Sequence, residues 1–303
     1  MNAKTLHSWS GIQDGRYSKS ELSHRFLHDS SFSNVKSAIS ETEVLIIDEI
    51  SMISRHVFEQ VEYVCRLVRN NDSNFGGLQV ILSGDFFQLP PVPNPSCYDD
   101  GQYCFMSDVF KFHHVCILEQ VVRQSDIAFI EAINAVSRGN VADKSLKYLE
   151  SLNKPLPSNL NPIYLFPNNF DVEIRNRIQL DSLPGEIKIY KSSNEFGSLS
   201  AINSLSAVQN LYLKVGCPVI LIKNLSSLLV NGLLGTVVLL KDHSVVVSFP
   251  SVDISYDIGY YNFSKFSCIE NKTVAFRHQI PLRLAFALTV HRCQGMTLDS
   301  VAN

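Results

Sequence analysis

The amino-acid sequence predicts an α/β protein with two domains and a small antiparallel β module in the second. Apolar strand-like runs alternate with helix-like segments over residues 44–82 and again from residue 163, as in a parallel sheet with crossover helices. Over roughly 207–278, short β-branched runs joined by turn residues replace that alternation. A length of 303 residues is enough for two modest domains, each with its own core.

The first domain is expected over residues 1–150. Residues 13–40 are polar and rich in serine, and their few apolar positions predict a short helix within a small insertion. The run "VLIID" (44–48) predicts a strand buried on both faces of a parallel sheet. Apolar residues at helical spacing between 57 and 68 predict a returning helix, and "LQVILSGDF" (78–86) predicts the next strand of a βαβ unit.

Two more elements complete this domain and lead to the second. "HVCILEQ" (114–120) predicts a third strand, and "IAFIEAINAVSRG" (127–139) predicts a helix with Gly139 as its C-cap. Proline and asparagine cluster in "NKPLPSNLNP" (153–162), which predicts a linker to a second domain over residues 151–303.

The second domain opens with another strand and helix. "IYLFPNN" (163–169) predicts the strand and "DVEIRNRIQL" (171–180) the helix. The β module follows, and its predicted strands are 217–224, 233–240 and 243–249. The chain then returns to an apolar segment, 282–299, whose far end is polar.

Composition limits the classes of function. A net charge of −3 gives no global sign of nucleic-acid binding, so such a partner must be held by a local groove. The seven cysteines are scattered without a Cys-x-x-Cys pair, which argues against a disulfide framework or a zinc site and for a reducing compartment. No apolar run approaches the roughly 20 residues of a membrane span, and no signal-peptide pattern is visible. We expect an intracellular protein without membrane contact.

Acidic and polar residues follow both strands of the first βαβ unit. Asp48 and Glu49 follow the first strand, while Gly84-Asp85 and then Gln88 follow the second. Ligands of open α/β sheets bind beyond these carboxyl ends. Asp48 suits Mg²⁺, Glu49 could activate a water that attacks a γ-phosphate, and Gln88 could sense that phosphate. A solvated turn is the alternative for an isolated Asp-Glu pair, but two acidic strand ends in one unit favour the site.

Three other segments have a functional and a structural interpretation. Arg123 could clamp phosphate charge or form a surface ion pair. "TVHRCQG" (289–295) could contact phosphate or nucleic acid, or it could be a strand-to-helix turn in which Gly295 supplies unusual dihedral angles. In "TLHSW" (5–9), Trp9 could stack on a base or belong to a core.

Taken together, these segments resemble one family, the Pif-type 5′-to-3′ DNA helicases of helicase superfamily 1. Five stretches occur in the order and spacing of that family: "TLHSWSGI", "LIIDEISM", "FGGLQVILSGDFFQLPPV", "VVRQ" and "LAFALTVHRCQGMTLD". The resemblance implies two RecA-like domains and a motor that uses ATP and Mg²⁺ to move along single-stranded DNA. It also implies that residues 207–278 are an SH3-like module and that residues 13–40 occupy the place of the strand-separating wedge.

The resemblance also implies roles for individual residues. Asp48 would ligate Mg²⁺, and Glu49 would be the catalytic base. Gln88 and Arg123 would contact the phosphates and complete the catalytic set, and Gly295 would contribute to the nucleotide site. The residues expected to contact DNA are Thr5, His7, Ser8, Thr289, His291, Arg292 and Gln294.

This chain departs from the family pattern at two places. Arg292-Cys293 stands where the family usually has Lys-Ser, a change that keeps the positive charge. The phosphate-cradling loop G-x-x-x-x-G-K-[ST] is absent from the 303 residues, and no glycine precedes a lysine. In the family that loop precedes "TLHS" and a last motif follows "TLD", so we expect both domains to be incomplete at their outer ends.

Two hypotheses follow. The first is an ATP-dependent DNA helicase, present as a partial chain with weak or no ATPase of its own. The resemblance would make it a monomeric motor on single-stranded DNA and DNA junctions, acting in DNA repair, recombination or telomere maintenance in the nucleus or mitochondrion. The second is a catalytically inactive, helicase-derived DNA-binding or interaction module.

Overall fold

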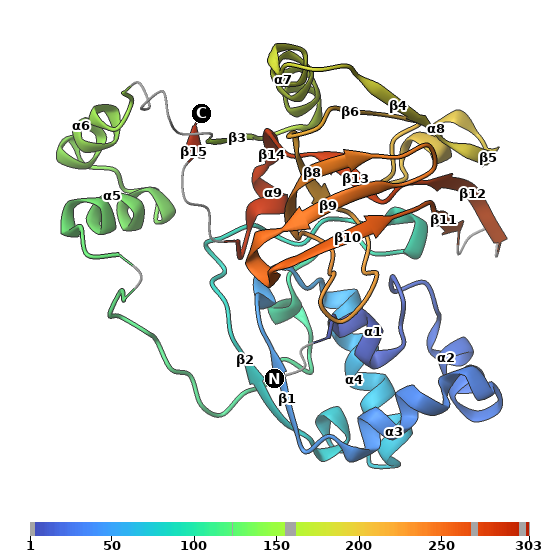
Figure 1. The fold of residues 1–303 in the computed structure, drawn as a ribbon. Coiled ribbons are helices and arrows are strands. Elements are labelled where there is room, and N and C mark those ends of the chain that lie inside the picture. Colours follow the sequence, from blue (N-terminus) through green and yellow to red (C-terminus); the bar gives the residue numbers. More distant parts are fainter. Residues whose placement is uncertain (1–3, 123, 155–161, 268–271, 297–300, 303) are drawn as a thin grey trace. The chain divides into compact units, whose positions relative to one another are not determined.

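The computed structural model describes residues 4–122, 124–154, 162–267, 272–296 and 301–302 (Figure 1). The chain divides into two compact units, Ala3–Leu156 and Pro157–Asn303. Each unit combines helices with a parallel sheet, so the predicted α/β class is confirmed.

The first unit is built on one βαβ element. Strands β1 (Val44–Ile47) and β2 (Gln79–Leu82) pair in parallel, as Figure 1 shows, and α4 (Arg55–Arg69) connects them. The hydroxyl of Ser54 accepts a hydrogen bond from the Val57 amide at 3.2 Å and so begins α4. One face of α4 is apolar and fully buried, which confirms the predicted strand, helix and strand.

The segment before β1 contains more helices than the single short helix that the sequence predicts. It contains α1 (Leu6–Ser10), α2 (Lys19–His28), the 3₁₀ turn η1 (Ser30–Phe32) and α3 (Ser33–Glu41). Ser18 and Glu21 form a reciprocal capping box at the start of α2. The buried side chains of these helices share one core with α4; they include Leu22, Phe26, Phe32 and Ile39.

A glycine turn and an arginine join α4 to the sheet. The 3₁₀ turn η3 (Asn74–Gly77) has left-handed dihedrals at Phe75 and Gly76. Arg69, in the last turn of α4, donates to the carbonyl oxygens of Gly76 at 2.8 Å and Thr42 at 2.9 Å. One guanidinium therefore holds the starts of both strands, β1 after Thr42 and β2 after the turn.

Two expectations for the first unit are wrong. The run 44–48 is not buried on both faces, because Val44 and Ile46 are 43% and 56% exposed. A continuous apolar run predicts a strand but cannot by itself show that both faces are covered. The run 114–120 forms no strand, and Val115, Ile117 and Leu118 are more than 80% exposed. β-Prone residues need a partner edge, and within the described part of this unit β1 and β2 pair only with each other.

Shorter turns and two helices complete the first unit. The 3₁₀ turns are η2 (Ile50–Met52), η4 (Pro95–Cys97) and η5 (Cys104–Met106), and the helices are α5 (Ile127–Ser137) and α6 (Asp143–Ser151). The predicted helix from residue 127 is thus confirmed, and Gly139 follows its cap residue in the left-handed conformation.

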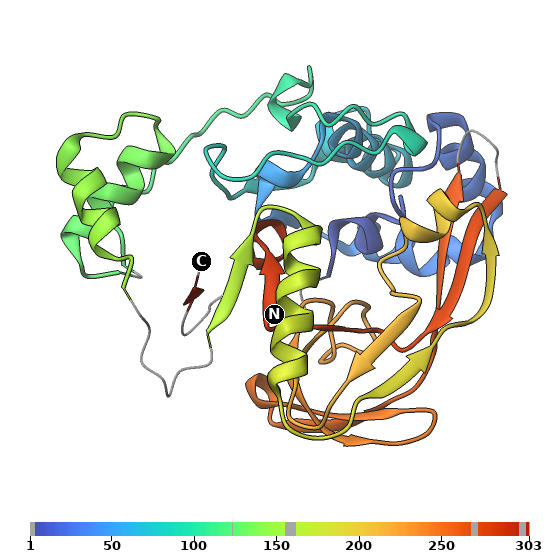
Figure 2. The same ribbon diagram turned by 90° about the horizontal axis from the view of Figure 1, so that it is seen from above.

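The second unit has a small parallel sheet covered by a helix. Strand β3 (Ile163–Phe166) lies between β14 (Ala287–Thr289) and β15 (Val301–Ala302), and both pair with it in parallel. Helix α7 (Asn169–Ser182) runs alongside β3 and β14, as Figure 2 shows in yellow-green beside red. The predicted strand and helix at 163–180 are confirmed.

Antiparallel strands occupy most of the remaining chain. A five-stranded sheet has the order β10-β9-β8-β7-β13, a three-stranded sheet the order β11-β12-β5, and β4 pairs with β6. The three strands predicted for the module are confirmed. The strand bounds are β4 (Lys188–Lys191), β5 (Ser193–Gly197), β6 (Asn210–Leu213), β7 (Pro218–Leu221), β8 (Leu234–Leu240), β9 (Val245–Phe249), β10 (Ile254–Ile258), β11 (Tyr261–Ser267), β12 (Lys272–Gln279) and β13 (Leu282–Leu284). The helices are α8 (Leu199–Asn203), α9 (Val290–Cys293) and the 3₁₀ turn η6 (Pro250–Val252).

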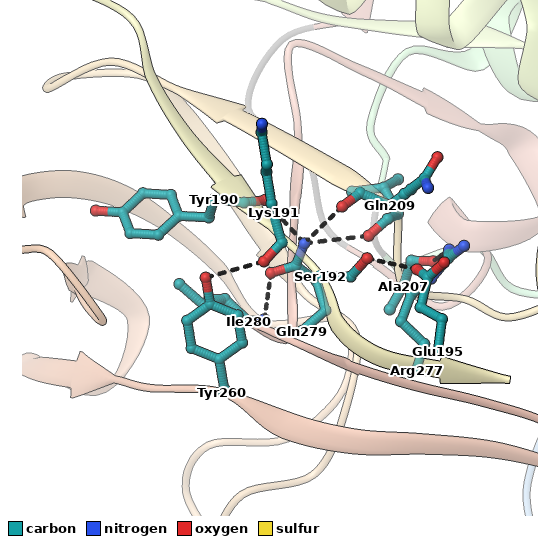
Figure 3. Close-up of polar contacts among 11 residues, drawn as sticks. Tyr190, Lys191, Ser192, Glu195, Ala207, Gln209, Tyr260, Arg277, Gln279 and Ile280 are labelled. Carbon is teal, nitrogen blue, oxygen red and sulfur yellow. Dashed lines mark hydrogen bonds and ion pairs between the residues drawn. The ribbon is translucent and has the colours of Figure 1, made fainter.

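Buried polar side chains at the end of β12 tie these sheets together (Figure 3). The fully buried amide of Gln279 donates to the carbonyl oxygens of Tyr190, Val208 and Gln209 and accepts from the Ile280 amide. Two positions earlier, Arg277 donates to Glu195 and to the Ala207 carbonyl. Leaving such buried carbonyls without a donor costs about 1–3 kcal/mol each, so this network fixes β12 against β4 and the chain before β6.

Among the helices of the described residues, none is both long and apolar enough to cross a membrane.

Gly76→Ala should destabilise the first unit strongly. A Cβ at Gly76 would lie 2.5 Å from the Cys65 carbonyl oxygen, and the residue is already at φ +62°. Strain and displacement together should lower the free energy of unfolding by about 2–4 kcal/mol. Gly139→Ala is the matched control, because Gly139 has φ +67° with nothing within 4 Å, and should lose only about 1 kcal/mol. Equal losses in urea denaturation would contradict this account of the turn.

Candidate functional site

The carboxyl ends of β1 and β2 lie side by side. The parallel register pairs Ile47 with Leu82, and the backbone pairing continues beyond both strands. The Ser83 amide donates to the Ile47 carbonyl at 2.9 Å, and the Ile50 amide donates to the Ser83 carbonyl at 3.0 Å. Asp48 and Glu49 are therefore held next to Ser83 and Gly84, as the sequence predicts.

The backbone at these strand ends is constrained on both sides. Glu49 adopts a left-handed conformation at φ +52°, which is uncommon for a residue with a side chain. The Asp48 carboxylate accepts from the Glu49 amide at 3.0 Å and supports this turn. Opposite it, Gly84 has φ +153°, and a Cβ there would lie 2.8 Å from the Ile50 nitrogen. The turn that presents Glu49 thus depends on a glycine in the neighbouring strand end.

Gln88 follows in a tight turn after β2. The Gln88 amide donates to the Asp85 carbonyl at 3.0 Å, and the Asp85 carboxylate accepts from the Phe87 amide at 2.9 Å. Behind the turn, the Phe86 ring packs against Phe105 with centroids 4.9 Å apart. The Gln88 side chain is exposed, so its carboxamide group can reach a ligand at the strand ends.

Asp48 fits a magnesium site of the open type. Its side chain is exposed at a strand end, and its hydrogen bond from the Glu49 amide uses one carboxylate oxygen. In the part of the chain that the structure describes, no three His, Cys, Asp or Glu side chains gather as a metal cage. Mg²⁺ commonly takes one or two carboxylates and keeps several waters or phosphate oxygens, which is the arrangement that Asp48 allows.

The segment predicted to contact DNA in the first unit is helix α1 and its cap. The Thr5 hydroxyl accepts from the Ser8 amide at 3.3 Å, and both residues are exposed. His7 is half-buried in a cavity of 470 Å³ that Asp14 and Asp99 also line. Trp9 packs partly against the core, which favours the structural interpretation of this residue.

The second predicted DNA segment follows β14. It is a strand-to-helix turn, with α9 after Thr289 and with Gly295 at φ +75°, as its structural interpretation predicts. Thr289 is buried at 7% exposure, His291 is exposed, and Arg292 is half-buried. Gln294 is the C-cap residue of α9 and is half-buried. Of the predicted DNA residues in this unit, His291 is therefore the most accessible.

The structure brings some predicted residues together and leaves others apart. Asp48, Glu49 and the Gly84-Asp85 pair form one site at the strand ends, with Gln88 on the adjoining turn. Arg123 lies outside the described residues. The two predicted DNA segments belong to different units.

Sequence reasoning missed two side chains that hold the elements of the first unit together. Arg69 gives no signal beyond a basic residue in the last turn of a helix. Asp99 is buried and accepts from the Ser54 hydroxyl at 2.6 Å, across 45 positions of sequence. A pattern of residue types cannot reveal partners at such separations.

Comparisons with known proteins identify the family to which the chain is similar. The family model described as "PIF1-like helicase" matches residues 1–147, and the model described as "DNA helicase Pif1, 2B domain" matches residues 199–240. The ATP-dependent DNA helicase RRM3 of Saccharomyces cerevisiae is 34% identical over 83% of this chain and 36% of that protein. The ATP-dependent DNA helicase PIF1 of Xenopus laevis is 34% identical over 99% of this chain and 48% of that protein.

Solved structures are similar as well. A crystal structure of Bacteroides Pif1 bound to single-stranded DNA has a TM-score of 0.81 and 30% identity, covering 98% of this chain and 71% of that one. The crystal structure of the Candida albicans Pif1 helicase has a TM-score of 0.84 and 28% identity, covering 99% and 73%. These likenesses define the class of protein, an α/β chain with the RecA-like fold of helicases. The chain belongs to the PIF1-like helicase family, and it spans about a third to a half of the length of the curated relatives named here.

His7 should make stability depend on pH. Burial lowers the pKa of His7, and this effect exceeds the opposing charges of Asp14 and Asp99. Because the unfolded chain then takes up the proton first, this contribution to stability is present above about pH 6.5 and is lost as the pH falls. The free energy of unfolding should fall more steeply from about pH 7 to about pH 5 in the wild type than in His7→Gln. The exposed His24 is the control, and a His24→Gln profile as flat as that of His7→Gln would contradict the assignment.

Proposed function

We propose that this protein acts as an ATP-dependent DNA helicase that translocates 5′ to 3′ along single-stranded DNA. The observation that carries the proposal is the paired strand end, where Glu49 is held beside Gly84 by backbone hydrogen bonds. The relatives are named ATP-dependent DNA helicases, and one similar structure is a Bacteroides Pif1 complex with ADP-AlF3 and single-stranded DNA.

In this proposal each strand-end residue has one task. Glu49 orients a water and accepts its proton as the water attacks the γ-phosphate of ATP. Asp48 holds Mg²⁺, which when bound neutralises charge on the phosphates. Gln88 reports the presence of the γ-phosphate to the DNA-contacting segments, and Arg123 completes the phosphate contacts.

The DNA-contacting residues are assigned to both units. Thr5 and Ser8 present exposed hydroxyls, and His291 presents an exposed imidazole; all three can donate to phosphate oxygens. Alternating grip by the two segments during ATP turnover would move the chain along one strand. Action on DNA junctions, and roles in repair, recombination or telomere maintenance in the nucleus or mitochondrion, belong to the same proposal.

A second candidate function is a DNA-binding module without catalysis. The observation that favours it is the absence of G-x-x-x-x-G-K-[ST] from residues 1–303, because that loop supplies most contacts to the β- and γ-phosphates. The exposed carboxylate of Asp48 and the strained turn at Glu49 favour the helicase, since strained backbone is commonly retained at functional sites.

Glu49→Gln separates the two functions. In the natural polypeptide that carries residues 1–303, this substitution should lower DNA-stimulated ATP hydrolysis by about 100-fold or more, because general-base catalysis contributes that much. Binding of oligo-dT, measured by fluorescence anisotropy, should not change. Glu43→Gln, an exposed glutamate just before the other end of β1, is the control and should leave turnover intact. Turnover that survives Glu49→Gln, or that is absent from the wild type, would favour the module.

A further inference from the structure

The second unit contains a pocket of 330 Å³ to which the proposed motor function assigns no small molecule. Its walls come from α7, the chain around β6, and residues 283–292. Most of the lining is apolar, with Val172, Leu180, Leu211 and Leu288 among the side chains that form it. The volume is at the lower end of the range for small-molecule sites, about 300–1,000 Å³.

Two arginines in this pocket have no partner for their charge. Arg283 and Arg292 are both half-buried, and within the described residues neither guanidinium makes a hydrogen bond or an ion pair. The Nε atom of Arg283 is buried without an acceptor. A guanidinium carries five N–H donors and stays charged, so an unpaired one in a partly dry site is unfavourable.

The surroundings of the two guanidiniums make their charge more unfavourable still. Burial lowers the pKa of both arginines, and the positive charge of Arg292 lowers the pKa of Arg283 further. Glu173, an exposed residue of α7, also lines the pocket, and its negative charge opposes this lowering of the Arg283 pKa; the two side chains form no ion pair among the described residues.

Two other arginines of the same unit show what a partnered guanidinium looks like, whereas Arg175, outside the pocket lining, has a buried Nε without an acceptor but lies 3.7 Å over the Tyr164 ring. Arg177 lines the same pocket, but its guanidinium meets Asp181 at 3.1 Å and lies over the Tyr212 ring. Arg277 is nearly fully buried and is satisfied by Glu195 and the Ala207 carbonyl. Of the three arginines that line this pocket, Arg283 and Arg292 are therefore the two whose guanidiniums lack a partner among the described residues.

We propose that this pocket binds a small organic anion, with a phosphate head on Arg283 and Arg292 and an apolar or aromatic body against the walls. A planar guanidinium matches the geometry of phosphate oxygens, and a second one adjacent to it supplies the remaining charge. The apolar lining would not stabilise a bare inorganic ion, but it can bury the apolar body of an organic anion.

The location of the pocket gives the ligand a regulatory position. Thr289 and Arg292 belong to the segment that is assigned to DNA, and both line this pocket. A ligand on Arg292 would therefore compete for, or reposition, one end of that segment. This consequence rests on the proposed function, whereas the binding site itself does not.

The test measures binding of 1-naphthyl phosphate to residues 1–303 by isothermal titration calorimetry. 1-Naphthol and inorganic phosphate supply the body and the head alone, and each should bind at least tenfold more weakly. Arg283→Gln and Arg292→Gln should each weaken the binding of 1-naphthyl phosphate at least tenfold. Arg177→Gln is the matched control and should bind like the wild type, because that arginine already has partners.

Further arms keep the result decisive. Thermal melting checks that the variants fold. If Arg283→Gln does not fold, Arg283→Lys replaces it. Arg283→Lys keeps the positive charge but not the planar guanidinium, so it should still bind 1-naphthyl phosphate more weakly than the wild type. 1-Naphthol that binds as tightly as the phosphate, or full affinity in Arg283→Gln, would overturn the site. A third outcome is that oligo-dT displaces the probe and that Arg283→Gln weakens the binding of oligo-dT. This outcome would assign the two arginines to DNA contact and overturn the small-molecule site.

Discussion

The site in the first unit depends on parallel backbone pairing that continues beyond the ends of β1 and β2. Two hydrogen bonds, from Ser83 to Ile47 and from Ile50 to Ser83, hold the two strand ends together. They leave no room for a side chain at Gly84, and Glu49 completes the turn in a left-handed conformation. The position of the proposed catalytic carboxylate is therefore a property of the sheet and not of the Glu49 side chain alone.

In the second unit, hydrogen bonds of buried polar side chains fix the positions of the strands. Gln279 satisfies backbone groups of four residues, and Arg277 joins Glu195 to the Ala207 carbonyl (Figure 3). These groups have partners within the fold, so they stabilise one arrangement of the sheets. Among the described residues the guanidiniums of Arg283 and Arg292 have no such partners, which is why we propose a ligand for these two arginines and a structural role for Arg277.

The elements that depend on local residue patterns could be predicted from the sequence. The βαβ unit, the helix from 127, the opening of the second unit and the adjacency of Asp48 and Gly84 follow from apolar spacing and strand order. The exposed run 114–120 shows the limit, because its strand propensity finds no partner edge in the described residues. Arg69 and Gln279 could not be predicted either: Arg69 meets Thr42 across 27 positions and Gln279 meets Tyr190 across 89, and no local pattern records such contacts.

Gly84→Ala tests most directly whether the paired strand ends perform hydrolysis. A Cβ there would lie 2.8 Å from the Ile50 nitrogen and 3.4 Å from the Glu49 carbonyl carbon, so the turn that carries Glu49 must move. In the natural polypeptide, DNA-stimulated ATP turnover should fall by about 100-fold, since small displacements of catalytic groups have effects of this size. The circular dichroism spectrum should stay native. Wild-type turnover in a folded Gly84→Ala variant would contradict the account.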